Sequence, residues 1–392
     1  MQKETQKFNL IAKTLAGLED ILVGELKEIG AEDIQVLTRA VSFNGDKEIM
    51  YKANYLCRTA IKILKPFASF LIRNEEDLYK EIKKIDWWDF MDVTDTLAVD
   101  CTLSDSYLTH SKYASLKTKD AIVDKFRDKY DERPSVNIEN PTLRVNVHIY
   151  RNNCSVSLDS SGESLHKRGY RKSTDMAPIN ELLAAGMILL SGWKKDCNFV
   201  DPMCGSGTIL IEAALIANNI PCGYYRKKYG FENWKDFDKE LFEKIKNEAA
   251  NNITEFEHRI IGSDKSAMAL KIAKENIRNA KLHKDIELNH VAIEDNFPPE
   301  GGGIIVTNPP YGERLKIDNI IKLYSVIGDS LKNQFTGFDV WILSSNNSAL
   351  KRVGLRTSRK IPLYNAKLEC KYVKFEIYKG SLKKKNNPVD ND

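Results

Sequence analysis

The chain has 392 residues, of which 42% are hydrophobic and 29% charged, and its formal net charge is +4. This length and composition indicate a soluble globular chain of two or three domains. No apolar run approaches the roughly twenty residues that span a bilayer, and residues 1–5 carry no apolar signal core. These features exclude a membrane-spanning or exported chain of the usual kind, so we expect a cytoplasmic protein without a membrane partner.

A net charge of +4 is too small by itself to identify a nucleic-acid binder, so the distribution of charge matters more than the sum. The cysteines form no Cys-x-x-Cys pair and no cluster with histidine at metal-binding spacing. They are Cys57, Cys101, Cys154, Cys197, Cys204, Cys222 and Cys370. This pattern indicates reduced thiols and predicts neither structural zinc nor another metal site.

The first 163 residues predict an α+β region. Apolar alternation indicates a strand, an amphipathic helix and a hairpin, at 8–12, at 18–29 and at 143–149 with 154–158. Such a region fits an RNA-capturing module. Trp87 and Trp88 lie beside apolar helix positions, so we interpret them as packing residues, the alternative being base stacking.

A basic segment at 166–172 places four fixed positive charges and one aromatic ring within seven residues. These side chains suit phosphates and an unpaired base, although a solvated linker has the same composition. The predicted RNA-binding residues are His166, Lys167, Arg168, Tyr170 and Arg171. Residues 224–229 repeat the basic-aromatic pattern, inside an insertion from which extra sequence can reach a substrate.

From residue 177 onward, helices alternate with short apolar strands, which predicts an α/β fold with a doubly wound sheet. The expected strands are 198–203, 259–263, 286–291, 303–307 and 339–344, followed by a pair at 358–364 and 370–378. Ligands bind such sheets at the carboxyl ends of the strands. Residues 381–392 are rich in lysine and predict a disordered basic tail.

A glycine turn follows the first of these strands. Gly205 and Gly207 let the backbone approach a ligand, and the next helix presents its N-terminus. The carboxylate of Asp201 would repel a pyrophosphate but suits the ammonium of S-adenosylmethionine. The expected cofactor contacts here are Asp201, Met203, Cys204, Gly205, Ser206, Gly207 and Thr208. We interpret the Cys204 thiol as a packing group, because methylation of an amine needs no thiol nucleophile.

Two further acids follow the neighbouring strands. Asp264 ends the second strand, where a carboxylate can bind ribose hydroxyls, and it also suits the N-cap of the following helix. We expect Lys265 beside it to contact the cofactor. Asp295 follows the third strand and is the candidate for the adenine amino group, the alternative being a solvated loop carboxylate.

The motif Asn308-Pro309-Pro310-Tyr311 follows the apolar run at 303–306. The Asn308 side-chain oxygen and the Pro309 carbonyl can each accept one N–H of a flat amino group, and the prolines preorganise these acceptors. Tyr311 is expected to stack on the extruded base. A strand-terminating turn has the same residues, but the glycine loop, Asp264 and Asn308 all fall at strand carboxyl ends. The catalytic residues are therefore predicted at 308–311.

Three motifs carry a family resemblance: Asp-Pro-Met-Cys-Gly-Ser-Gly-Thr at 201–208, Gly-Ser-Asp at 262–264 and Thr-Asn-Pro-Pro-Tyr-Gly-Glu-Arg at 307–314. They resemble the class I S-adenosylmethionine-dependent methyltransferases that modify exocyclic amines. More narrowly, the chain is similar to the THUMP-containing RlmL-type family that makes N2-methylguanine in large-subunit ribosomal RNA. Segments 8–10, 17–19, 164–171, 177–185 and 363–365 extend the likeness over nearly the whole chain.

The resemblance implies a ferredoxin-like region at 1–60, a THUMP RNA-binding domain at 61–163 and a Rossmann-like methyltransferase domain at 164–380. It implies S-adenosylmethionine as cofactor, ribosomal RNA as partner and one active site, and the motifs say nothing of oligomeric state. Two alternatives stay open at this point. One is an adenine-N6 methyltransferase acting on DNA or RNA, and the other is a catalytically silent ribosome-assembly factor.

Overall fold

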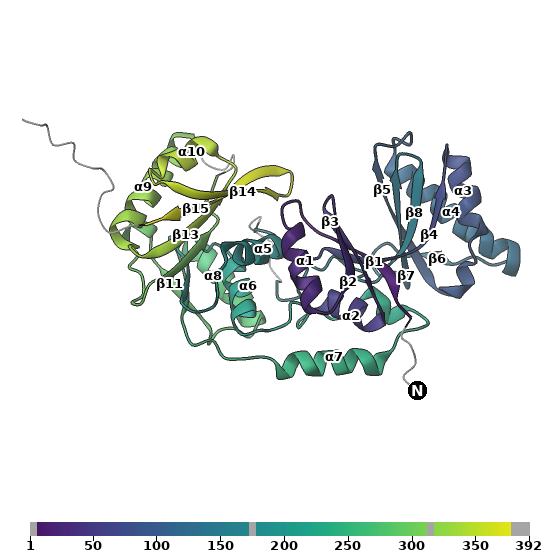
Figure 1. Cartoon of the computed structure of the whole chain (residues 1–392), viewed down its shortest axis with the longest axis horizontal. Coiled ribbons are helices and arrows are strands. Elements are labelled where there is room, and N and C mark those ends of the chain that lie inside the picture. Colours follow the sequence, from purple (N-terminus) through teal and green to yellow (C-terminus); the bar gives the residue numbers. More distant parts are fainter. Residues whose placement is uncertain (1–5, 172–177, 312–316, 378–392) are drawn as a thin grey trace, which may run out of the picture. The chain divides into compact units, whose positions relative to one another are not determined.

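A computed structural model describes residues 6–171, 178–311 and 317–377 (Figure 1). The chain forms two compact units. The first unit comprises Met1–Gly169 and Ile220–Ile253, and the second comprises Tyr170–Asn219 and Thr254–Asp392. The segment at 220–253, which lies inside the range expected for the methyltransferase domain, belongs to the first unit. The tail predicted at 381–392 lies outside the described residues.

The first unit is built on an eight-stranded sheet of order β2-β3-β1-β4-β8-β7-β5-β6. Its strands are β1 Phe8–Lys13, β2 Glu32–Leu37, β3 Ala40–Gly45, β4 Lys62–Leu71, β5 Thr96–Ser104, β6 Ser135–Val136, β7 Leu143–Tyr150 and β8 Asn153–Asp159. Its helices are α1 Glu19–Glu28, α2 Lys47–Leu56, α3 Glu75–Lys84, α4 Ser111–Tyr130 and α7 Lys239–Asn251, with short 3-10 turns η1 Trp87–Asp89 and η2 Gly230–Asn233. The predicted strand, helix and hairpin of this half are confirmed as β1, α1 and β7–β8.

The two adjacent tryptophans are packing residues, as predicted. Trp87 is fully buried and donates its indole N–H to the Ile82 carbonyl over 3.0 Å. The Trp88 ring lies under the Lys129 ammonium, which is 3.4 Å from the ring centroid. Helices α3 and α4 lie side by side against this part of the sheet (Figure 1).

The segment at 220–253 joins the first unit through aromatic packing. The Tyr51 ring of α2 stacks on Phe231 with 4.3 Å between ring centroids, and Phe242 of α7 meets Tyr51 edge-on at 5.7 Å. The Tyr51 hydroxyl also accepts the backbone N–H of Asp238, the N-cap of α7, over 3.0 Å. Since these rings are buried, this insertion is mainly a structural part of the first unit.

The second unit contains a seven-stranded sheet of order β11-β10-β9-β12-β13-β15-β14. Its strands are β9 Asn198–Asp201, β10 Ile260–Asp264, β11 Ile286–His290, β12 Gly303–Thr307, β13 Phe338–Ser344, β14 Thr357–Asn365 and β15 Leu368–Glu376. Its helices are α5 Glu181–Ser191, α6 Thr208–Ala217, α8 Ala267–Asn279, α9 Ile317–Gln334 and α10 Asn347–Arg352, with the 3-10 turn η3 Ile293–Asp295. All seven expected strands are present.

Strand order in this sheet reverses between β9 and β12. Strands β11, β10, β9, β12 and β13 run parallel, and β15 is antiparallel to β13. The first two crossovers lead outward to one side of β9, and the next two lead to the other side. This is the doubly wound arrangement, with its ligand crevice at the carboxyl ends of β9 and β12. Across the described residues, no helix is both long enough and apolar enough to cross a membrane.

Candidate active site

The predicted site residues of the sheet meet at one edge. Strands β10, β9 and β12 are adjacent and parallel, so their carboxyl ends lie together. Asp264 ends β10, Asp201 ends β9, and Thr307 ends β12 directly before Asn308. The predicted common edge is therefore confirmed, and it coincides with the reversal of strand order.

Asp201 is buried, and it connects the glycine loop with the end of β12. Its Oδ1 accepts the Thr307 hydroxyl over 2.7 Å and the Met203 backbone N–H over 3.2 Å. Within the described residues, both hydrogen bonds end on Oδ1, which leaves Oδ2 for a cation. Burial raises the pKa of the Asp201 carboxyl to about 7. A ligand ammonium would restore its charge, because an opposite charge favours ionisation.

The glycine loop has the open backbone that a ligand needs. Gly205 has φ +53°, and a Cβ built there would meet no atom within 4 Å. Gly207 has φ +78° and is the N-cap of α6, but a Cβ built there would meet Ala273 at 3.2 Å. The Asn276 side chain of α8 donates to the Ser206 carbonyl over 3.1 Å. Gly205 therefore faces open space on a loop that Asn276 holds in place.

Asp264 holds the glycine loop against β10. Its Oδ2 accepts the Gly205 N–H over 3.0 Å, and its Oδ1 accepts the Ser266 N–H over 2.8 Å. Ser266, rather than Asp264, is the N-cap of α8, since its side chain accepts the Ala269 N–H. The predicted capping role of Asp264 is therefore wrong. Each carboxylate oxygen keeps a second lone pair for a ribose hydroxyl.

The remaining predicted cofactor contacts differ in exposure. Lys265 is exposed, and its carbonyl accepts the His290 imidazole N–H over 3.1 Å. Cys204 is buried, with its thiol pKa raised by burial, in keeping with a packing role. Asp295 is exposed at the end of η3. Its buried neighbour Asn296 donates to the Ser263 hydroxyl over 2.6 Å and fixes η3 against β10.

Thr208 is held by a predicted RNA-binding residue. Its hydroxyl lies 3.3 Å from that of Ser206 and accepts the Arg171 guanidinium over 2.9 Å. Arg171 also donates to the Ile179 carbonyl, and it forms an ion pair of 3.1 Å with the buried Glu181. Its guanidinium is therefore paired within the second unit, which gives Arg171 a structural role, and its contact with RNA stays a prediction.

The rest of the junction at 166–170 is mainly structural. Arg168 is 2% exposed and donates to the Leu165 and Arg58 carbonyls, and Tyr170 is 1% exposed with its hydroxyl 3.1 Å from Glu212 Oε1. The prediction that Arg168 and Tyr170 bind RNA is wrong, because both side chains are buried. His166 is half-buried with Nδ1 2.7 Å from the Ser164 hydroxyl, and exposed Lys167 pairs with Glu163.

Arg226 shows the same use of a basic side chain. Its guanidinium donates to carbonyls in the junction loop, at 3.0 Å to Ser164 and 3.1 Å to Ser161. Its pKa is lowered by burial. The buried Tyr229 ring stacks on Phe231 with 5.2 Å between centroids. The expectation that residues 224–229 reach the substrate is therefore wrong for Arg226 and Tyr229.

The acceptor loop, residues 308–311, carries a buried side-chain oxygen that has no hydrogen-bond partner among the described residues. Asn308 is half-buried, and within the described residues its Oδ1 accepts no hydrogen bond although the atom is buried. Such atoms are rare in native structures, since an unsatisfied buried acceptor costs about 1–3 kcal/mol. Pro309 is buried and Pro310 is exposed. The arrangement suits an N–H donor supplied by a substrate.

Tyr311 has packing and hydrogen-bond contacts that a ring used only for stacking would not need. It is half-buried and packs against the hydrophobic cluster formed by β12, β13, β15 and α9. Its hydroxyl accepts the Asn365 side-chain N–H over 2.7 Å. Asn365 and Thr307 are the residues that sequence reasoning missed. Both stood inside recognised motifs, but the sequence did not show which partners they meet.

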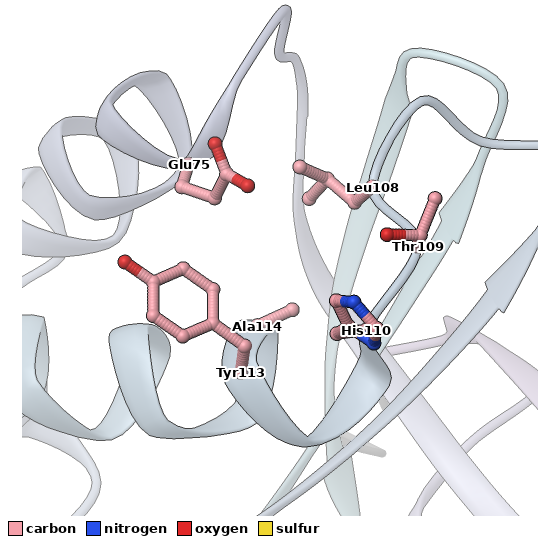
Figure 2. A pocket seen from close by; sticks show the side chains of 6 residues that line it. All are labelled: Glu75, Leu108, Thr109, His110, Tyr113 and Ala114. Atoms are coloured by element: carbon pink, nitrogen blue, oxygen red, sulfur yellow. The ribbon is translucent and has the colours of Figure 1, made fainter.

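A small recess lies in the first unit, apart from these motifs (Figure 2). It is lined by the start of α3, the loop before α4 and the first turn of α4, namely Glu75, Leu108, Thr109, His110, Tyr113 and Ala114.

The seven cysteines are free thiols. Within the described ranges, no group of three or more His, Cys, Asp or Glu side chains is placed to hold a metal ion.

Matches to family models cover the chain in three parts. The model for an RMKL-like methyltransferase domain matches residues 168–374, a THUMP domain matches 73–159, and an RlmL ferredoxin-like domain matches 9–64. The doubly wound sheet, the edge carboxylates and these matches define an S-adenosylmethionine-dependent methyltransferase with a THUMP domain. The chain belongs to the RMKL-like methyltransferase family.

Two curated relatives are similar over nearly the whole chain. A candidate RNA methyltransferase of Synechocystis, slr0064, is 38% identical over 94% of this chain and 96% of its own length. The ribosomal RNA large subunit methyltransferase K/L of Syntrophotalea carbinolica is 38% identical over 92% of this chain. That match covers 52% of the K/L protein, so the chain spans about half the length of this relative.

Two solved structures share the fold along the whole chain. SMU.472, a candidate methyltransferase solved with S-adenosylhomocysteine, is 30% identical with a TM-score of 0.86, and the match covers 97% of this chain and all of SMU.472. A Listeria monocytogenes protein described as a predicted N6-adenine-specific DNA methylase is 29% identical with a TM-score of 0.84. That match covers 95% of this chain and 97% of the Listeria chain.

Proposed function

We propose that this protein methylates an exocyclic base amine in RNA, namely N2 of a guanine in large-subunit ribosomal RNA. The observation that carries the proposal is the buried Asn308 Oδ1, which has no hydrogen-bond partner in the described part of the chain and lies at the sheet edge shared with Asp201 and Asp264. The THUMP domain and the ribosomal RNA relative support RNA as the substrate.

The carboxylates and the glycine loop are proposed to hold the cofactor. Asp201 Oδ2 faces the cofactor ammonium, Asp264 binds the ribose hydroxyls, and open space beside Gly205 receives the ligand. Asp295 remains the proposed contact for the adenine amino group. Bound S-adenosylmethionine supplies a methyl group activated by its sulfonium. In this proposal the methyl donor lies next to β12, because the Thr307 hydroxyl donates a hydrogen bond to Asp201.

The acceptor loop is proposed to orient the base. An exocyclic amine is a weak nucleophile because its lone pair is delocalised into the ring. Asn308 Oδ1 and the Pro309 carbonyl each accept one N–H, which turns the lone pair out of the ring plane and towards the methyl group. As the nitrogen–carbon bond forms, the bond between the methyl group and sulfur would break. The methylated nitrogen then carries a positive charge and loses its proton to water, so no strong base is required.

Adenine N6 is the second candidate target, because the same acceptors serve that amine and the Listeria relative is described as a predicted N6-adenine-specific DNA methylase. The THUMP domain favours structured RNA over DNA.

Nucleoside mass spectrometry on ribosomal RNA from a deletion strain separates the candidates. Loss of one N2-methylguanine, restored by the wild-type chain but not by Asn308→Ala, supports the proposal. Loss of N6-methyladenine assigns the adenine target instead. An unchanged nucleoside profile contradicts ribosomal RNA methylation and favours a silent assembly factor, for which calorimetry with S-adenosylmethionine should then detect no binding.

A further inference from the structure

The acceptor loop is held at both of its ends. At one end the Thr307 hydroxyl donates to Asp201 Oδ1 over 2.7 Å. At the other end the Tyr311 hydroxyl accepts the Asn365 side-chain N–H, also over 2.7 Å. Asn308 and two prolines are all that lies between these anchors, and each proline has a restricted φ. The position of Asn308 therefore depends on both anchors.

The second anchor belongs to the β14–β15 hairpin. Asn365 is the last residue of β14, and Leu363 on the same strand face pairs with Cys370 of β15. The Cys370 thiol lies 3.9 Å from the Tyr311 hydroxyl, so two hairpin side chains meet that one oxygen. Burial raises the pKa of the Tyr311 phenol, which keeps the group neutral.

A stacking role uses only the face of a ring. Stacking therefore does not explain why the Tyr311 hydroxyl is partly buried. Nor does it explain why that hydroxyl accepts a hydrogen bond from Asn365, which lies 54 residues later in the chain. If stacking were the whole role, phenylalanine would serve equally well at this position. The hydrogen-bonded hydroxyl indicates that Tyr311 holds the acceptor loop in position, whether or not its ring also contacts the base.

We propose that Tyr311 anchors the acceptor loop through its hydroxyl, and that Asn365 is a positioning residue for methyl transfer. This inference rests on the proposed function, because the anchor matters for the reaction only if Asn308 orients the amine. Asn365 acts through Tyr311 and the loop backbone. In-line transfer tolerates little displacement, and a misplacement of about 1 Å costs up to about 100-fold in rate.

The test compares Tyr311→Phe, Asn365→Ala and the double variant in single-turnover methyl transfer to ribosomal RNA from a deletion strain. Each single variant should react about 10- to 100-fold more slowly, with the KM for RNA and the Kd for S-adenosylmethionine within about twofold of wild type. The double variant should be no slower than the slower single variant, because both remove the same bond.

Two further variants separate positioning from general damage. Asn365→Asp should recover most of the rate, since the phenol can donate to a carboxylate. Tyr364→Phe removes the exposed hydroxyl next along β14 and should leave the rate unchanged. A wild-type rate in Tyr311→Phe would overturn the inference and leave stacking alone. Multiplying effects in the double variant would overturn it as well.

Hydrogen exchange tests the anchor without any substrate. The Asn308 and Tyr311 amides should exchange faster in Tyr311→Phe and Asn365→Ala than in wild type or Tyr364→Phe. Unchanged exchange would overturn the anchor. If wild-type protein transfers no methyl group to RNA while exchange still responds, the proposed function fails and the anchor stands.

Discussion

The Thr307 hydroxyl donates a 2.7 Å hydrogen bond to Oδ1 of Asp201, a residue 106 positions earlier in the chain. The bond crosses from β12 to β9 at the point where strand order reverses. It joins the residue before the acceptor motif to the carboxylate proposed to bind the cofactor ammonium. Donor and acceptor sides of the site therefore share one hydrogen bond.

The buried charge of Asp201 makes stability depend on pH. Burial raises the pKa of this carboxyl from 3.8 to about 7. The unfolded chain therefore ionises first, and the contribution of this group to folding free energy falls as pH rises through this range and stays low above it. Asp201→Asn removes the charge but keeps an acceptor for Thr307. In thermal denaturation without cofactor, its Tm should exceed that of wild type at about pH 8.

The same comparison at about pH 5 gives the control, because wild-type Asp201 is then largely protonated in the folded state. The gap between the two Tm values should be clearly smaller there, because the penalty in folding free energy builds up between about pH 3.8 and about pH 7. If Asp201→Asn were less stable than wild type at both pH values, the buried Asp201 carboxylate would not be destabilising when ionised.

Cofactor affinity should depend on the same ionisation of Asp201, but in the opposite sense: affinity should rise with pH where stability falls. An ammonium ligand favours the ionised carboxylate, so binding of S-adenosylmethionine should weaken as pH falls below about 7, by up to about tenfold per pH unit. Calorimetric Kd values across this range measure the slope. Asp201→Asn should bind weakly at every pH, with little slope. A wild-type Kd that does not vary would remove Asp201 from the ammonium site.

Asn308→Ala should slow methyl transfer strongly while leaving cofactor binding near normal. The change removes one acceptor for the amine, and losing a preorganised polar group of this kind costs about 100- to 1,000-fold in rate. Rates come from transfer of labelled methyl groups to RNA, and Kd values from calorimetry. Asn251→Ala, an exposed position at the end of α7, is the matched control. Equal loss of rate and cofactor affinity would contradict an orienting role.

Much of the second unit was predictable because strand periodicity and ligand chemistry point to the same residues. Asp201, Asp264 and Asn308 each follow an apolar strand, and parallel strands bring such positions to one edge. The partners of these residues were not predictable. Which oxygen Thr307 meets, or that Asn365 reaches Tyr311, depends on side-chain packing between segments far apart in sequence. Ser266 displaced Asp264 as the cap because helix α8 begins at Ala267.

Gly205→Ala and Gly207→Ala should differ in their effects on cofactor affinity and on stability. Both have positive φ, which costs a residue with a Cβ about 1–2 kcal/mol. At Gly207 the added methyl also meets Ala273 at 3.2 Å, whereas at Gly205 it meets no atom within 4 Å. We expect the larger drop in Tm for Gly207→Ala. For a given drop in Tm, Gly205→Ala should lose more cofactor affinity than Gly207→Ala. If Gly207→Ala lost more affinity instead, the ligand would not lie beside Gly205.

The basic junction misled sequence reasoning because composition does not show which way a charged side chain points. Arg168, Arg171 and Arg226 each present a planar group with several donors. In this fold those donors satisfy backbone carbonyls and a buried carboxylate. A run of cations next to an aromatic ring thus describes a structural junction here as well as it would an RNA contact.

Arg168→Ala should therefore lower stability rather than RNA affinity. Its loss leaves the Leu165 and Arg58 carbonyls without their guanidinium donors in a buried place, which we expect to cost about 2–4 kcal/mol. Thermal denaturation measures this loss, and RNA titrations at several salt concentrations measure the number of phosphate contacts. The salt slope of Arg168→Ala, taken well below its Tm, should equal that of wild type. Lys167→Ala, exposed on the same loop, should keep its Tm. A variant of Arg168 with normal Tm and a shallower salt slope would restore this arginine to the RNA interface.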